Sequence, residues 1–570
     1  MLRPALHLKH SNKIVPIHRA ILPRRQPITF LLHQPTSHQR TICFSTTLKM
    51  ASLSSSSAAA AAAAAYDQAL SRLSSLQSNT SITSLFTSLP APSKKDINSL
   101  AIPEMQAWCV RAGLTPELLA SSGLKCVHVA GTKGKGSVSS YVASILQQYS
   151  SAGTPVGLYT SPHLVSVRER INIDGKPVSR ELFTRYVNLV WDALTSSALK
   201  LDKGLTQKEC EGPGTKPFYF RFLTIVALRM FVDEGIKNAV VECGIGGEYD
   251  STNAVFLSGG ENVVSCAVVT QLGIDHVGML GDTVEKIAWH KAGIFKPQRK
   301  GFTLGRSKQN SVIEVLRERA REKGAAELVE VGEEEVREWD GVEDANLEGP
   351  FAKGNMALAV HAAREHLLRQ GVKFEGVFGE DGKWTLKDIP EEFVKGLREA
   401  RLRGRCEIVN DKRDASVEWC VDGAHTEDSL AGVGEWFAGR VKEDGLTVLV
   451  FNQQDRDPAV LLKALLNGAK KGFGEGGSVF THAIFTRNEE NRAKEGEERD
   501  VSAQRKAEET MKAFDSRVET SVYTNVGSAV EHVRVLAAQA KKEGKSCKAL
   551  ATGSFYLVGG VLRLIDEVEY

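Results

Sequence analysis

A short apolar run, a glycine-rich turn and a helix-compatible segment follow one another directly in the first half of the chain. The run is Val127–Ala130, the turn is Gly131–Ser137 (GTKGKGS), and the helix-compatible segment extends over 138–149. Such a turn gathers backbone N–H groups and a helix N-terminus around one point, and Lys135 adds a positive charge there, so the unit is typical of a phosphate-binding loop. It predicts nucleotide binding, with a purely structural glycine-rich turn as the alternative.

The loop departs from the common phosphate-loop pattern at two places. Only two residues separate Gly131 from Gly134, where the common pattern has four. Gly136 follows Lys135, so the hydroxyl group of Ser137 comes one position late for the usual Mg²⁺ role. We expect the nucleotide to contact the whole turn, Gly131, Thr132, Lys133, Gly134, Lys135, Gly136 and Ser137.

Length and composition limit the class of protein. A chain of 570 residues is longer than a single hydrophobic core usually supports, which predicts two or more domains. With 42% hydrophobic residues, 25% charged residues and a net charge of +3, the composition is that of a globular protein and does not indicate a nucleic-acid partner. No run of 18 apolar residues occurs, so no transmembrane insertion is expected. The nine cysteines lack paired CxxC spacing, which predicts free thiols in a reducing compartment rather than disulfides or a zinc site.

The N-terminal segment differs from the rest of the chain. Residues 1–49 carry basic, Ser and Thr residues but no acidic one, and the first acidic residue is Asp67. This pattern predicts a mitochondrial targeting leader, although its prolines leave a disordered tail as the alternative. Met50 offers a second start, so we expect both a mitochondrial form (matrix or inner-membrane-associated) and a cytoplasmic one. Residues 50–65, which include the Ala58–Ala65 run, are expected to form a low-complexity spacer.

From Tyr66 onward, strand-like apolar runs alternate with helix-like segments. This alternation predicts an α/β fold with mostly parallel sheets covered by helices. Thr115-Pro116-Glu117 marks a helix start. In the first part we expect strands at Pro155–Tyr159, Ala239–Glu242 and Val263–Thr270, and helices at Arg180–Leu194, Phe222–Val232 and Val284–Phe295. In the second part we expect strands at Val417–Val421, Thr447–Phe451 and Ala483–Thr486, and a helix at Gln504–Phe514.

Two charged stretches interrupt the pattern. The acid-rich residues Glu327–Glu348 are expected to form a solvated segment without specific structure, and Asn488–Arg499 a surface loop. The chain is expected to pass from its first alternating region of strands and helices to its second between Asp388 and Arg401. This boundary divides the chain into expected domains at 66–395 and 396–570.

Several short motifs occur in a fixed order along the chain. Besides the phosphate loop they are Tyr159–Val165 (YTSPHLV) with Arg168–Ile171 (RERI), Val241–Gly247 (VECGIGG), Tyr249–Asn253 (YDSTN), Leu272–His276 (LGIDH) with Leu280–Thr283 (LGDT), Ile287–Ile294 (IAWHKAGI), Asp422–Thr426 (DGAHT), Phe451-Asn452 with Asp455–Pro458 (DRDP), and Thr552–Ser554 (TGS). With these motifs the chain resembles the Mur-ligase-like family of ATP-dependent amide-forming ligases, in its folate–glutamate ligase branch. The resemblance implies a Mur-ligase-like P-loop ATPase domain and a smaller Rossmann-like α/β C-terminal domain.

The resemblance also implies a reaction. ATP would activate the γ-carboxylate of tetrahydrofolate, or of a folylpolyglutamate, as an acyl phosphate that L-glutamate then attacks. Such a monomeric enzyme would retain folates in the cell and in mitochondria for one-carbon metabolism. A dihydrofolate synthase, which joins the first glutamate to dihydropteroate, is the alternative, although the pattern from Asp422 to Ser429 looks more like the polyglutamylating enzyme. A nucleotide-binding switch or assembly protein without ligase chemistry is the alternative from another class.

Glu242 and His276 are candidate metal ligands. Glu242 ends an apolar run before a glycine-rich turn, where a carboxylate faces the ligand crevice of an open α/β sheet or caps a helix. His276 follows the strand Val263–Thr270 and by itself would more often be a structural residue. The resemblance assigns Ser161, Glu242 and His276 to Mg²⁺, a set that suits this ion. It implies ATP and Mg²⁺ as cofactors, with a monovalent cation such as K⁺ as a further candidate.

Lys291 has two interpretations. It lies on a helix with Ile287 and Ile294 on a largely apolar face, where a lysine can extend its amine to solvent. In the family that the chain resembles, a lysine at this position is carbamylated by CO₂ and becomes a carboxylate-like metal ligand, which requires a neutral amine. By the same resemblance Lys135, Lys291 and His425 are the expected catalytic residues.

Three further residues are expected to bind ATP. By resemblance Arg405 contacts phosphate, Asp422 lies near the ribose, and Asn355 lies on the adenine side. Without the family, a salt bridge in the linker would explain Arg405. The chain departs from the family where Pro350-Phe351-Ala352 replaces an acidic-His-Gln run and where Leu402-Arg403 replaces Trp-Pro.

Overall fold

The structure is a computed structural model. It describes residues 47–76, 91–150, 154–257, 263–305, 310–347, 349, 351–374, 385–441, 445–454, 456–473, 478–492 and 498–566. The predicted targeting leader lies outside the described residues apart from Thr47–Lys49. From Ala61 onward the chain forms one compact unit, which contains both of its sheets.

The expected low-complexity spacer is helical. Helix α1 spans Thr47–Ser75 without interruption, so the alanine run is part of a helix that continues into the folded chain. Alanine is the best helix former, which explains why a run without specific contacts still adopts this structure. Beyond the run, Tyr66, Ala69 and Leu73 are buried in the core.

The first sheet has eight strands in the order β4-β3-β2-β5-β1-β6-β7-β8. Its strands are β1 (Lys125–Ala130), β2 (Val156–Tyr159), β3 (Ile171–Ile173), β4 (Lys176–Pro177), β5 (Asn238–Glu242), β6 (Val264–Val269), β7 (Lys300–Leu304) and β8 (Glu327–Val331). The pairs β2–β3 and β3–β4 are antiparallel and the others are parallel. We call the part that contains this sheet, residues 91–400, the first lobe.

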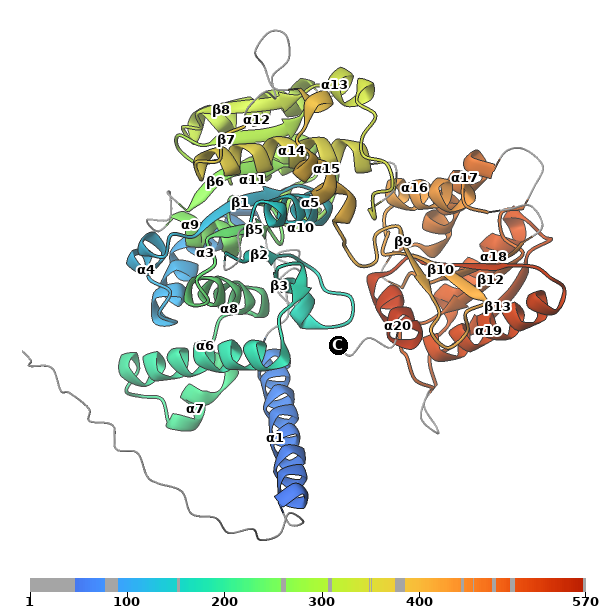
Figure 1. Ribbon diagram of the computed structural model, residues 1–570, viewed down its shortest axis with the longest axis horizontal. Coiled ribbons are helices and arrows are strands. Elements are labelled where there is room, and N and C mark those ends of the chain that lie inside the picture. The colour runs from blue at the N-terminus through green and yellow to red at the C-terminus, as the bar shows by residue number, and fades with distance from the viewer. Residues whose placement is uncertain are drawn as a thin grey trace, which may run out of the picture. The chain divides into compact units, whose positions relative to one another are not determined.

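Helices cover both faces of this sheet (Figure 1). They are α3 (Ala91–Arg111), α4 (Pro116–Ser121), α5 (Lys135–Gln148), α6 (Arg180–Leu201), α7 (Gln207–Glu211), α8 (Tyr219–Asp233), α9 (Ser251–Leu257), α10 (Val277–Leu280), α11 (Val284–Ala292), α12 (Asn310–Glu322), α13 (Glu333–Glu338), α14 (Ala352–Arg369) and α15 (Glu391–Glu399), with 3-10 turns η1 (Val167–Arg170), η2 (Pro213–Thr215) and η3 (Leu386–Asp388). Val127 and Val129 of β1 pack against α5 and α14, whereas Cys126 belongs to the core on the face of α6 and α8. Burial on both faces is what makes the parallel strands continuously apolar.

The second sheet has six strands in the order β13-β12-β11-β14-β10-β9, and only β9–β10 is antiparallel. We call residues 401–566 the second lobe. Its elements are β9 (Glu407–Asn410), β10 (Val417–Asp422), α16 (Glu427–Ala438), β11 (Leu446–Phe451), α17 (Pro458–Phe473), β12 (His482–Thr486), α18 (Ser502–Phe514), β13 (Glu519–Tyr523), α19 (Val526–Lys542), β14 (Cys547–Thr552) and α20 (Phe555–Ile565). Helices α16, α17 and α18 pack on one face, and α19 and α20 on the other.

The predicted α/β class with mostly parallel sheets is confirmed, and each strand and helix expected from the alternation is present within a few residues of its expected bounds, except that the helix expected at Arg180–Leu194 continues to Leu201. Thr115 caps α4 by accepting a hydrogen bond from the Leu118 N–H at 3.2 Å, as its position before Pro116 predicts. The domain limits at 66–395 and 396–570 stay a prediction.

The interpretation of Glu327–Glu348 as solvated and unstructured is wrong. The segment contains β8, which pairs in parallel with β7 at the sheet edge, and α13. Val331 is buried, while Glu327 and Glu330 form ion pairs with Lys300 and Arg317. The run ELVEV does not alternate between polar and apolar residues, because Val329 and Val331 pack on one face and Leu328 on the other. The acidic composition of the segment therefore hid the strand.

Two further expectations concern the thiols and membrane insertion. The eight cysteines among the described residues are all free and buried, as their scattered spacing predicts. In the described part of the chain, none of the helices has the length and apolar character needed to cross a membrane. The charged segment Asn488–Arg499 lies partly outside the described residues.

Candidate active site

The phosphate loop connects the end of β1 to the start of α5. Gly134 caps α5 at φ 84°, a left-handed conformation that favours glycine. A Cβ atom on Gly131 would come within 1.8 Å of Thr270 Oγ1, so this close approach to the neighbouring strand end also requires glycine. The hydroxyl group of Thr270 donates to the Lys133 carbonyl at 2.7 Å. These contacts fix the loop against the sheet before any ligand binds.

Two lysines meet at one carbonyl group of this loop. Lys135 Nζ lies 3.2 Å and Lys291 Nζ 2.7 Å from the Gly131 oxygen. Lys291 is only 2% exposed. Burial, together with the charge of Lys135, lowers the pKa of Lys291 to about 7. The interpretation of Lys291 as a side chain that extends to solvent is therefore wrong.

Glu242 ends β5 and is 3% exposed. Its Oε2 accepts a hydrogen bond from the Ser161 N–H at 3.0 Å, so the two residues are brought together as predicted from the motifs. Burial raises the pKa of Glu242, and the positive charges of Lys135, Arg405 and Arg170 oppose this effect. A buried carboxylate whose pKa is raised by burial and lowered by nearby cations is typical of a functional site.

A chain of buried polar side chains holds the turn that follows β5. Asp250 accepts hydrogen bonds from the N–H groups of Gly244 and Ile245, at 3.0 and 3.1 Å, and from the Thr252 hydroxyl at 2.6 Å. Because the hydroxyl proton points to Asp250, His128 Nε2, at 2.8 Å, donates to the Thr252 oxygen. The motif Tyr249–Asn253 (YDSTN) thus positions the segment next to the strand-end carboxylate.

His276 lines the same cavity but does not contact Glu242. It caps α10 in a left-handed conformation at φ 50°, and its Nε2 lies 3.6 Å from Asp275 Oδ2. Asp275 also lies 3.7 Å from Arg456 Nη2 of the second lobe. Sequence reasoning assigned no role to Asp275 or Arg456. Their motifs, LGIDH and DRDP, were the signal, since each places a charged residue in a turn after a strand.

The second lobe contributes Arg405 and Asp422. Both carboxylate oxygens of Asp422 accept backbone hydrogen bonds, from the N–H groups of Cys406 and Ala424 at 2.8 Å each. Burial raises the pKa of Asp422, and Arg405 opposes this. The Arg405 guanidinium lies 4.4 Å from the Phe555 ring centroid and joins no ion pair among those found in the described residues. Asp422 therefore holds the loop that carries Arg405, and a linker salt bridge does not explain this arginine.

His425 and Asn355 complete the predicted set. His425 Nδ1 lies 3.1 Å from the Gly423 carbonyl, and burial lowers the pKa of His425. Asn355 is 7% exposed and packs under the phosphate loop, where a Cβ on Gly134 would lie 2.5 Å from Asn355 Oδ1. Phe351, at the start of the same helix, lines the cavity and is 38% exposed. Pro350 lies outside the described residues.

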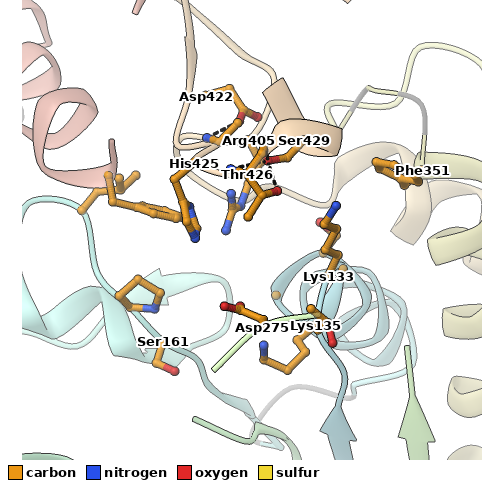
Figure 2. A pocket seen from close by; sticks show the side chains of 18 of the residues that line it. Lys133, Lys135, Ser161, Asp275, Phe351, Arg405, Asp422, His425, Thr426 and Ser429 are labelled. Carbon is orange, nitrogen blue, oxygen red and sulfur yellow. Dashed lines mark hydrogen bonds between the residues drawn. The ribbon is translucent and has the colours of Figure 1, made fainter. Parts of the chain in front are cut away.

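These groups surround one cavity of about 950 Å³. Figure 2 shows Lys133 and Lys135 of the phosphate loop on one side, and Arg405 and His425 of the second lobe on another. Of the predicted site residues, Gly131 and Lys291 are the two that do not line the cavity: Gly131 begins the loop, and the amine of Lys291 lies behind it on the Gly131 carbonyl. Among the described residues no group of three or more His, Cys, Asp and Glu side chains could hold a metal ion.

A phosphate loop at a helix N-terminus and a buried carboxylate at a strand end of an open α/β sheet are typical of a nucleotide-binding site. No family model matches the chain. The folylpolyglutamate synthase of Saccharomyces cerevisiae is 35% identical over 518 residues, which cover 88% of this chain and 87% of that protein. The chain therefore belongs to the folylpolyglutamate synthase family. It is an ATP-dependent ligase that adds glutamate to folates.

Solved structures support the fold. The folylpolyglutamate synthase of Mycobacterium tuberculosis, complexed with ADP and AMPPCP, aligns with a TM-score of 0.59 at 24% identity and covers 80% of this chain and 94% of its own. The E. coli FolC protein in complex with DHPP and ADP aligns with a TM-score of 0.52 at 23% identity, over 80% of this chain and 92% of its own. The curated yeast relative favours a folylpolyglutamate synthase over the dihydrofolate synthase alternative.

Proposed function

We propose that the cavity between the two lobes carries out ligation in two steps. A γ-carboxylate oxygen of tetrahydrofolate, or of a folylpolyglutamate, attacks the γ-phosphorus of ATP and displaces ADP. The amine of L-glutamate then attacks the acyl phosphate carbon and loses a proton, and inorganic phosphate leaves as the amide forms. The observation that carries this proposal is one cavity lined by the phosphate loop, Glu242 and Arg405. ADP, AMPPCP and DHPP in the solved relatives support the same use of this site.

The residues of the chain would act mainly by position and charge. The transferred phosphoryl group needs in-line placement and cancellation of its negative charge rather than covalent help. Lys135 and the N–H groups of the loop would supply this on the first lobe, and Arg405 on the second. His425 would shape the wall near the attacking amine. Closure of the two lobes over the substrates would keep water from the acyl phosphate.

The residues present fit a Mg²⁺ ion. Glu242 is a buried carboxylate beside Ser161, and Glu242, Ser161 and His276 line one cavity. One carboxylate with few other protein ligands suits an ion that keeps several of its waters. When bound, the ion would neutralise charge on the phosphates of ATP. The ring of His276 faces Asp275, so its part in binding requires a turn of the side chain. A monovalent cation such as K⁺ remains a further proposal from the resemblance.

The structure also supports carbamylation of Lys291. The lysine is buried and its pKa of about 7 leaves a large fraction of the amine uncharged near neutral pH. A neutral amine adds to CO₂, forming an N–C bond and releasing one proton, and leaves a carbamate anion. The anion would replace one of the two positive charges that now face the Gly131 carbonyl. It would attract Lys135 rather than repel it.

Two assays test the proposed function. ADP release that depends on L-glutamate separates ligation from nucleotide binding without chemistry. Comparison of tetrahydrofolate with dihydropteroate as acceptor separates the polyglutamylating activity from dihydrofolate synthesis. We expect ADP release with tetrahydrofolate and L-glutamate together, and little with dihydropteroate. An equal rate of ADP release with and without L-glutamate would contradict the proposal.

Location in the cell and oligomeric state follow as proposals from the sequence. We propose a mitochondrial form that uses residues 1–49 for targeting, a cytoplasmic form that starts at Met50, and a monomeric enzyme. A reporter fused to residues 1–49 should enter mitochondria, and one fused to a chain that begins at Met50 should stay in the cytoplasm. A cytoplasmic signal from the first fusion would show that the leader is only a tail.

A further inference from the structure

The cations of the cavity differ in what they contact. They are Lys133, Lys135, Arg170, Arg405, Arg456 and Arg563. Lys133, Arg456 and Arg563 each form an ion pair with a carboxylate. Lys135 belongs to the phosphate loop, and Arg405 lies over an aromatic ring. These five have a partner or a role in the proposed phosphoryl transfer, which leaves one cavity-lining guanidinium group to explain.

Arg170 ends η1 and joins none of the ion pairs found in the described residues. Its Nε donates a hydrogen bond to His163 Nδ1 at 2.8 Å, and its guanidinium carbon lies 5.6 Å from the ring centroid of Tyr219. Because arginine can only donate, Nδ1 of His163 is an acceptor, and the proton of the neutral ring is on Nε2. Arg170 and His163 both line the cavity. The terminal nitrogens of Arg170 and the Nε2–H of His163 therefore form a set of donors with one net positive charge.

The loop that carries this pair is held in place without a ligand. Glu169 accepts hydrogen bonds from the backbone N–H groups of Leu164, Val165 and Ser166, at 2.9, 3.0 and 2.7 Å. Ser166 in turn caps η1, so a capping box closes the loop. A donor pair on a loop fixed in this way loses little conformational entropy when it binds an anion.

We infer that Arg170, positioned by His163, binds a carboxylate of a glutamyl unit in the cavity. This inference rests on the proposed function. A guanidinium fork matches the two oxygens of a carboxylate, and a set of donors without an acceptor selects an anion. Phosphate groups have the loop around Lys135 to bind them, so the anion at Arg170 is a carboxylate. Both acids of the reaction carry one, the incoming L-glutamate and the glutamyl tail of the folate.

Binding without ATP distinguishes the two sources. Tetrahydrofolate carries one glutamyl unit and tetrahydropteroate carries none, so their ratio of Kd values reports recognition of the tail. If the tail binds at Arg170, Arg170→Gln should reduce this preference about 10- to 100-fold, as expected for a lost hydrogen bond to a charged group. If the incoming amino acid binds there, the preference stays and the KM for L-glutamate rises by a similar factor. Arg185→Gln, at an exposed arginine outside the cavity, is the matched control.

Three further variants separate binding from a change in the fold. Arg170→Lys keeps the charge but not the fork, so we expect an intermediate loss. His163→Leu removes the acceptor for Arg170 Nε and should weaken the same ligand, whereas His163→Asn offers an oxygen near the Nδ1 position and should restore part of it. The KM for ATP should stay within about twofold in all four variants.

Either of two results would overturn the inference. In the first, Arg170→Gln leaves both the tail preference and the KM for L-glutamate unchanged. In the second, its main effect is a higher KM for ATP. Failure of the proposed function would look different, because the wild-type chain itself would then form no product.

Discussion

The two lobes hold their parts of the active site in different ways. In the first lobe Glu242 and Lys291 are 3% and 2% exposed, and each is tied to backbone by a hydrogen bond. One ion pair that crosses to the second lobe is more exposed, although Leu164 of the first lobe, 9% exposed, packs in an apolar cluster of the second lobe. The side chain of Asp428, which pairs with Lys133 at 2.9 Å, is 83% exposed.

The buried groups suit the chemical step, whereas the exposed ion pair suits the entry of substrates and the release of products. Buried groups with fixed partners keep their geometry while charge develops on the transferred phosphoryl group, so they need no reorganisation. Exposed ion pairs contribute little free energy, so the pair between Lys133 and Asp428 would oppose separation of the lobes only weakly. The first lobe supplies the buried Glu242 and Lys291, and the second lobe supplies one buried carboxylate, Asp422, together with the more exposed groups at the contact.

Loss of Lys135 should have the largest effect. Lys135→Ala removes the positive charge of the phosphate loop, and we expect kcat to fall by about 10²- to 10³-fold with an unchanged melting transition. Lys286→Ala, at an exposed lysine paired with Asp282, is the control and should keep wild-type activity. Turnover of Lys135→Ala within a few-fold of wild type would remove the phosphate-loop assignment.

Glu242→Gln keeps the shape of the side chain but removes its charge. We expect a fall in kcat of about 10²-fold that higher Mg²⁺ partly restores, because a charged ligand is lost from a site that keeps other oxygen ligands. A Mg²⁺ titration of both enzymes measures this. The same Mg²⁺ dependence in variant and wild type would contradict a metal-binding role.

Lys291 tests whether a buried lysine of the first lobe acts as an anion. Lys291→Ala and Lys291→Arg should both lose activity, by about 10- to 100-fold, because arginine stays charged and cannot carry a carbamate. A short carboxylic acid should partly restore the alanine variant. In the wild type, bicarbonate should activate the enzyme more as the pH rises through about 7, where the amine loses its charge. An active Lys291→Arg enzyme would exclude the carbamate.

The polar chain behind β5 should affect stability more than chemistry. Thr252→Val removes the hydroxyl group that donates to Asp250 and leaves His128 Nε2 with only Cys243 Sγ, at 3.1 Å, as a partner, at a cost of about 1–3 kcal/mol in the free energy of unfolding. Thr252→Ser keeps the hydroxyl group and is the matched control. Urea denaturation measures the stability of both variants. Equal midpoints for the valine and serine variants would show that the hydrogen bonds among Asp250, Thr252 and His128 do not hold the turn after β5.

The smallest effect is expected at the contact between the lobes. Asp428→Asn removes the ion pair with Lys133. Because the carboxylate of Asp428 is largely exposed, the free energy of unfolding should change by less than about 1 kcal/mol. Thermal melting at low and high salt tests this. A loss of several kcal/mol would mean that this ion pair holds the lobes together as firmly as the buried contacts do, and it would contradict the difference between the two lobes.

The sequence predicted the parts of the site that depend on local pattern. A strand, a glycine-rich turn and a helix form one continuous segment, so the phosphate loop could be recognised without the structure. Glu242 could be recognised because a carboxylate after an apolar run marks the end of a buried strand. The edge strand at Glu327–Val331 could not, since its acidic side chains are neutralised by Lys300 and Arg317, which lie elsewhere in the sequence.

Contacts between distant segments also escaped prediction. That Lys291 and Lys135 share the Gly131 carbonyl depends on how α11 packs behind the loop, 160 residues away from it in the chain. The pairing of Asp275 with Arg456 depends on where the two lobes meet. No periodicity or spacing carries that information, although the motifs around these residues indicated that they matter.

The most direct test is the mass of the product. The full chain is incubated with tetrahydrofolate, ATP, Mg²⁺ and isotopically labelled L-glutamate, and the folates are analysed by mass spectrometry. We expect folates that carry one or more additional labelled glutamyl units, together with one ADP for each unit added. Unchanged tetrahydrofolate, or ADP formed without labelled product, would contradict the proposed ligation.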